Sequence, residues 1–146
     1  MKTERSNKPY TMLSVALGVL ILTGVVFFIY FLGQSTTKET EVLLTDKSVE
    51  VKGMFSTSID YEKISSVELK DNLPAIGRKN NGSAVGGAYK GNFMVDGLGE
   101  CKLYVLSGNG PFVYIKADEK YIIINYKDKE ATEKLFNELS AKWKNV

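Results

Sequence analysis

The chain of 146 residues contains no histidine, one cysteine and three prolines. Histidine is the commonest general base and the commonest metal ligand, so its absence excludes Ser-His-Asp and Cys-His catalytic groups and every histidine-ligated metal site. The lone cysteine, Cys101, cannot form an intramolecular disulfide, a thiolate metal cage or a two-cysteine redox pair. We therefore expect a protein that carries no cofactor.

Net charge is also small, and it is unevenly placed. The chain has 19 basic and 17 acidic residues, and its first ten residues hold Lys2, Arg5 and Lys8 against Glu4. The rest of the chain is left with 16 residues of each sign and is neutral. Strong nonspecific binding to nucleic acid needs clustered cations. The sequence therefore predicts no nucleic-acid partner.

The longest apolar run covers residues 11–32, TMLSVALGVLILTGVVFFIYFL, and contains no charged residue. A helix of this length extends about 33 Å, which matches a hydrocarbon layer of about 30 Å. The alternative is a cleaved secretory signal, whose apolar core usually has about 7–15 residues. We predict a retained transmembrane helix at 11–32 that follows a basic tail at 1–10. The excess of Lys and Arg before the helix favours a domain outside the cytoplasm.

After a small polar linker at residues 33–40, residues 41–146 carry the pattern of a β-rich domain. Apolar and polar residues alternate in short runs separated by turn residues, as in Cys101-Lys102-Leu103-Tyr104-Val105, which predicts consecutive antiparallel hairpins. From Asp128 the period changes, and Ala131, Leu135, Leu139 and Trp143 form one apolar stripe of a helix. The stripe predicts that this helix packs on the sheet.

Residues 77–91, GRKNNGSAVGGAYKG, contain five glycines and little apolar periodicity, which predicts a long, mobile loop. Its polar residues are the candidate ligand-binding residues, because cations and free backbone N–H groups can bind an anionic headgroup or an acidic peptide. These residues are Arg78, Lys79, Asn80 and Lys90. The alternative is that they only solubilise the loop, with Arg78 paired to an acid such as Asp71.

Two further residue classes have side chains that could take part in catalysis. Paired carboxylates could act as acid and base, and the candidates are Asp60, Glu62, Glu68 and Glu100, all at outward alternating positions. Cys101 falls at an inward position, which favours a small core residue over a nucleophile. We therefore predict that the protein is not an enzyme and identify no catalytic or metal-binding residues.

Several segments resemble a bacterial pleckstrin-homology (PH) family. They are VKGMFSTSIDYEKISSVELKDNLPAIGRKNNG, GNFMVDGLGECKLYV, PFVYIKA and YIIINYKDKEATEKLFNEL, in this order between Val51 and Leu139. The resemblance implies a mainly β fold, an antiparallel barrel or sandwich of about seven strands capped by one carboxy-terminal helix, in a membrane-attached context. It implies no catalytic residues. Phosphoinositide-binding relatives have clustered Lys and Arg in the first interstrand loop, whereas the matching turn here, residues 53–57, carries no charge.

The predicted function is a membrane-anchored, noncatalytic PH-like binding module. Its partners are the lipid bilayer and either a protein or a lipid headgroup, engaged by loops or an exposed strand edge, and a homo-oligomer is compatible with the same pattern. One alternative is a structural subunit whose anchor helix packs through Gly18 and Gly24 against other helices. Another is a small hydrolase or transferase that uses the acidic residues.

Overall fold

The computed structural model describes residues 9–37 and 39–145. It divides into two compact units, Met1–Ser35 and Thr36–Val146, which are described separately. The basic residues predicted to precede the anchor, Lys2, Arg5 and Lys8, lie outside the described residues.

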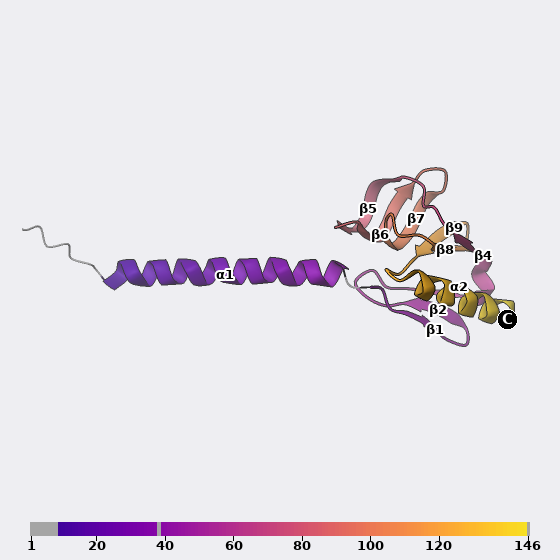
Figure 1. Cartoon of the computed structure of the whole chain (residues 1–146), viewed down its shortest axis with the longest axis horizontal. Helices are drawn as coiled ribbons and strands as arrows, with labels where there is room; N and C mark the ends of the chain where they lie inside the picture. Colours follow the sequence, from indigo (N-terminus) through magenta and orange to yellow (C-terminus); the bar gives the residue numbers. More distant parts are fainter. Residues whose placement is uncertain (1–8, 38, 146) are drawn as a thin grey trace, which may run out of the picture. The chain divides into compact units, whose positions relative to one another are not determined.

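The first unit contains all but the last two residues of the helix α1, Pro9–Thr37 (Figure 1). Its segment Met12–Phe31 has a mean hydropathy of 2.7 and no buried residue. By length and composition it can cross a membrane, a criterion that a leader sequence also meets. Thr23 donates its hydroxyl hydrogen to the carbonyl of Val19 at 2.8 Å, so this polar side chain is satisfied within the helix. The helix continues to Thr37, so most of the predicted linker is helical.

The second unit contains two sheets. An antiparallel sheet has the order β1-β2-β3, formed by Val42–Leu44, Ser48–Val51 and Thr57–Asp60. A short 3₁₀ helix, Tyr61–Lys63, leads into a sheet of order β4-β8-β9-β7-β6-β5. Its strands are β4 (Ile64–Lys70), β5 (Ile76–Val85), β6 (Ala88–Val95), β7 (Gly99–Leu106), β8 (Phe112–Ala117) and β9 (Lys120–Ile124).

Strands β7 and β9 pair in parallel, and every other pair is antiparallel. The helix α2, Lys129–Lys144, follows the last strand and packs against β4 and β8 of the large sheet (Figure 1). The predicted mainly β fold with one carboxy-terminal helix is confirmed. The described residues form nine strands where about seven were expected.

Alternation along the strands of the large sheet produces a buried cluster on each face. Leu103 and its neighbours Cys101 and Val105 lie in one cluster, together with Phe93 and Tyr114. The other cluster contains residues of β2, β3, β8, β9 and α2. Tyr104, which alternation predicts to be exposed, is buried there, because this face is covered by the small sheet. Its hydroxyl donates to the carbonyl of Phe55, and burial raises its pKa.

Helix α2 begins and packs as its sequence predicts. Asp128 is the N-cap, and its carboxylate accepts the N–H of Glu130 at 3.0 Å. Leu135 and Leu139 are buried, and the Trp143 indole donates to the carbonyl of Ile64 at 3.1 Å. The helix is therefore fixed to the first strand of the large sheet as well as to its core.

The glycine-rich region is an ordered hairpin, so the prediction of a long loop at residues 77–91 is wrong. Gly86 and Gly87 form the two-residue turn between β5 and β6 with φ of 57° and 81°, which glycine adopts without strain. Gly82 lies opposite Gly91, and a Cβ at Gly91 would be 2.4 Å from the carbonyl oxygen of Asn81. Glycine here permits close strand pairing and is no sign of flexibility.

Candidate functional site

The hairpin brings two of the four predicted binding residues together. The Arg78 Nε donates to Oδ1 of Asn80 at 3.3 Å, and the Asn80 amide donates to Oε2 of Glu100 at 2.7 Å. The other oxygen of Glu100 lies 3.8 Å from the ammonium of Lys120. We name these four residues the Arg78 cluster; they run from β5 across to β7 and β9, and Glu100 is partly buried whereas the other three are exposed. In the described part of the chain Arg78 makes no ion pair with Asp71.

The other two predicted residues do not join this cluster. Lys79 is in register with Phe93 of the core. Lys90 is in register with Ser83, five residues beyond Arg78 on β5, and this offset corresponds to about 16 Å along a strand. Lys90 instead lines a small pocket with Tyr104 and Asn125, and its partial burial lowers its pKa. The four residues therefore do not converge on one ligand.

A pocket of about 310 Å³ lies next to the Arg78 cluster, between β3 and the strands β7 and β9. Its charged lining residues are Lys63, Lys102, Lys120, Glu100 and Asp118. Lys63 lies 3.6 Å from the carboxylate of Asp60, so it is already paired. Lys102 donates to the carbonyl of Ser56 at 3.3 Å and has no carboxylate within 4 Å among the described residues. Partial burial lowers the pKa of Lys102.

The carboxylates that could act as acid and base are dispersed, and all but Glu100 are exposed. Glu68 lies 2.9 Å from the ammonium of Lys70, and Glu100 belongs to the Arg78 cluster. Among the described residues no three Asp, Glu, Cys or His side chains gather in a way that could hold a metal ion. Cys101 is buried, and burial followed by the nearby charge of Glu100 raises the pKa of its thiol to about 11. This thiol is protonated at neutral pH, which disfavours a nucleophilic role.

A larger surface feature lies between β1 and α2, which come from opposite ends of the domain sequence. It is a groove of about 660 Å³, which we name the β1–α2 groove. The strand contributes Val42, Leu43 and Leu44, and the helix contributes a row of small, apolar and charged side chains: Ala131, Lys134, Leu135, Glu138, Ala141 and Lys142. Tyr126 completes the lining. The sequence pattern predicts an exposed strand edge in general terms but neither this strand nor its helical wall.

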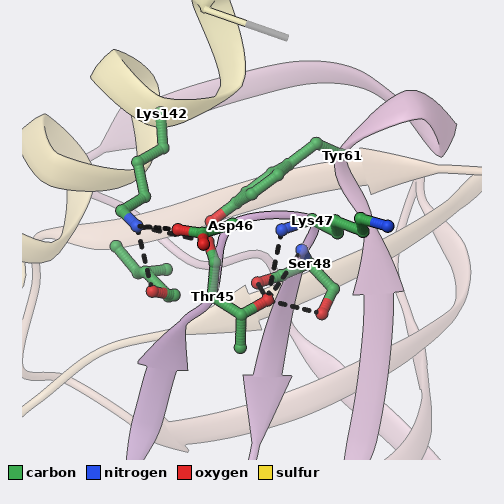
Figure 2. Close-up of polar contacts among 7 residues, drawn as sticks. Thr45, Asp46, Lys47, Ser48, Tyr61 and Lys142 are labelled. Atoms are coloured by element: carbon green, nitrogen blue, oxygen red, sulfur yellow. Dashed lines mark hydrogen bonds and ion pairs between the residues drawn. The ribbon is translucent and has the colours of Figure 1, made fainter.

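One end of the groove is closed by a network around Lys142 (Figure 2). The Lys142 ammonium donates to the carbonyls of Leu44 and Thr45, both at 3.2 Å, and lies 3.9 Å from the carboxylate of Asp46. The Tyr61 hydroxyl donates to the same Thr45 carbonyl at 3.1 Å. These contacts fix the last turn of α2 to the end of β1, so the groove has a defined width at this end.

The model of the bacterial PH domain family matches residues 40–140. This range is more than half of the chain, so the chain belongs to the bacterial PH domain family. A search of curated proteins finds no match, and a search of solved structures finds none. The family membership inferred from the sequence motifs is thereby confirmed.

Proposed function

We propose that this bacterial PH domain protein is a membrane-tethered, noncatalytic binding module, in which α1 holds the domain at the cell membrane and the β1–α2 groove receives a protein partner. The observation that carries the proposal is the groove itself, an open surface of about 660 Å³ beside the edge strand of a sheet. Ligand pockets typically have volumes of about 300–1,000 Å³.

The residues support recognition more than reaction. Domains of this family are in general noncatalytic binding modules. The chain has no histidine, its candidate carboxylates are exposed except for the partly buried Glu100, and its thiol is buried. Recognition needs only complementary shape and polar groups, and the β1–α2 groove offers both.

Tethering follows from the composition of α1. The segment Met12–Phe31 is long and apolar enough to cross a bilayer. A module confined to the membrane meets other membrane proteins at a raised effective concentration, so weak contacts in the groove suffice. We retain the expectation that the domain lies outside the cytoplasm.

The test has two parts. Full-length protein should remain in the membrane fraction after salt and alkaline washes and should require detergent for extraction. Crosslinking in intact cells, with a photoreactive residue at Ala141 in the groove, should capture a membrane-associated protein, whereas the same residue at Glu133 should not. Recovery of uncleaved chain in the detergent-free soluble fraction would refute the tether. Protease treatment of intact cells would establish the side of the membrane on which the domain lies.

A second candidate function, recognition of an anionic lipid headgroup, is favoured by Lys102. Its ammonium is partly buried and has no carboxylate partner in the described part of the chain, and Arg78 lies in the adjoining cluster. Full-length protein in nanodiscs should then bind vesicles that contain phosphatidylglycerol, and Lys102→Gln should weaken this binding severalfold. Lys127→Gln, at an exposed lysine outside the pocket lining, serves as the control. Equal binding by both variants would contradict this candidate.

A further inference from the structure

The edge of β1 presents backbone hydrogen-bonding groups to the β1–α2 groove. The N–H of Lys52 donates to the carbonyl of Glu41, and the N–H of Thr45 donates to that of Ser48, both at 2.9 Å. Because bonded and non-bonded pairs alternate in an antiparallel ladder, Leu43 also bonds to β2 whereas Val42 and Leu44 direct their N–H and C=O groups away from it.

Most of these outward groups are available to a ligand. The Leu44 carbonyl accepts the Lys142 ammonium. No hydrogen bond within residues 39–145 reaches the N–H or C=O of Val42 or the N–H of Leu44. An unpaired strand edge is a template on which another extended segment can pair.

The groove is bounded by a contact at each end. At one end the N–H of Lys127 donates to the carboxylate of Glu39 at 2.8 Å, and at the other Lys142 contacts Leu44. Glu39 and Leu44 are five residues apart, which corresponds to about 16 Å of extended chain. This length fits a short extended peptide segment.

The charges of the groove differ between its ends. Tyr126 lines the groove, and its pKa is raised by burial first and then by the charges of Glu39, Glu138 and Glu41. Neither Glu39 nor Glu41 has a cation within 4 Å among the described residues. Glu138 lies 3.9 Å from Lys134, but this pair is exposed and contributes little. Glu138 lines the groove and Glu39 and Glu41 lie near Tyr126, so carboxylates outnumber the one lining cation there, Lys134, while the Lys142 end is capped by a cation.

From this arrangement we propose that the β1–α2 groove binds an extended peptide segment of a protein partner as an added strand on β1, with apolar side chains against Leu135 and a Lys or Arg at the Tyr126 end. This inference rests on the proposed function and specifies its ligand. The backbone of the peptide bonds to Val42 and Leu44, and its cation faces Glu138 and the neighbouring carboxylates. An acidic or a proline-rich segment does not satisfy these groups.

The experiment uses full-length protein in lipid nanodiscs and a phage-displayed library of random heptapeptides, with counter-selection on the Val42→Pro variant. Enriched peptides should alternate apolar residues and carry Lys or Arg near one end. A synthetic, labelled copy of the enriched peptide then gives a Kd by fluorescence anisotropy. Bound peptide should slow hydrogen–deuterium exchange at residues 42–44.

The variants are matched in pairs. Val42→Pro removes an outward N–H from β1, and Ser58→Pro removes one from β3, the opposite edge of the same sheet. The first should weaken binding at least tenfold, and the second should leave it unchanged. Glu138→Lys should weaken binding, and a peptide whose Lys or Arg is replaced by Glu should restore it. Glu133→Lys, at an exposed position outside the groove, should have no effect.

Three results would overturn the inference. They are the absence of enriched peptides, unchanged exchange at residues 42–44 with peptide bound, and a dimer in the nanodisc that Val42→Pro dissociates, since the occupant would then be a second copy. If Val42→Pro does not fold, the exchange measurement on the wild-type protein and the charge reversal at Glu138 still test whether the peptide binds in the groove. The Val42→Pro variant could still require detergent for extraction and crosslink to its partner at wild-type levels. This result would refute strand addition on β1 but not the proposed function as a membrane-tethered binding module.

Discussion

The docking of α2 can be tested at Leu139, whose side chain has no exposed surface. It belongs to the core cluster that joins the helix to both sheets, together with Val49 and Ile115. Truncation of a buried leucine to alanine removes its transfer energy and leaves a cavity, at a cost of about 2–5 kcal/mol. Because Leu139 is fully buried, we expect Leu139→Ala to lower the free energy of unfolding by about 3 kcal/mol. At about 4 °C per kcal/mol this lowers the Tm by about 12 °C.

The assay follows denaturation of the full chain in detergent micelles. Trp143 is the only tryptophan and lies one turn beyond Leu139 on the same helix, so its fluorescence reports release of α2. Circular dichroism reports the sheets. Asn137→Ala, at an exposed position of the helix, should change the free energy by no more than about 0.5 kcal/mol. A loss below about 1 kcal/mol in Leu139→Ala would show that the helix does not pack as described.

Three further changes test the hairpin, the helix start and the buried ionisable groups. Gly91→Ala places a Cβ 2.4 Å from the Asn81 carbonyl oxygen at a φ of 112°, and it should lower the free energy of unfolding by at least about 2 kcal/mol. A Tm within 2 °C of wild type, which corresponds to roughly half a kcal/mol, would contradict this prediction. Asp128→Ala removes the N-cap and should cost about 1 kcal/mol in urea denaturation, with Asp128→Asn nearly neutral. The folded state raises the pKa of Cys101 from 9.0 to about 11 and that of Tyr114 from 10.0 to about 12. The contribution of these groups to stability should therefore be complete below pH 9, the ordinary pKa of a Cys thiol, and should be lost as the pH rises toward 12. A Tm that does not change with pH across this window would refute the burial of both groups.

The spacing of apolar residues along the sequence predicts the helices and strands that bury one face against the core. Leu135 and Leu139 recur at helical spacing after a capping Asp128, and the structure buries both. Leu103 alternates with polar Lys102, and the structure buries Leu103 and leaves Lys102 partly exposed. Tyr104 departs from the alternation because the small sheet covers its face. That coverage depends on tertiary packing and has no local signal in β7.

The hairpin of β5 and β6 was not predicted because glycine is frequent both in flexible loops and in strands whose backbones pair closely, and composition alone does not distinguish the two. Gly82 and Gly91 have no side chain because the facing strand backbone comes too close. The local signal was Gly86-Gly87 between Val85 and Ala88, a two-residue pair typical of a hairpin turn with positive φ. A single loop would allow Lys90 and Arg78 to reach the same ligand. The pairing of β5 with β6 instead holds these two residues apart.

The β1–α2 groove could not be predicted from any one segment, since its walls come from opposite ends of the domain and meet only through contacts such as Lys142 to Leu44. The short free edge of β1 also limits affinity, because it offers three free backbone groups among the described residues and hydrogen bonds are worth about 0.5–1.5 kcal/mol each. Recognition this weak becomes useful when the partner is confined to the same membrane. Deleting α1 should therefore abolish recruitment in cells while leaving the Kd for an isolated peptide unchanged, and a lowered peptide affinity would instead place part of the binding surface on the helix.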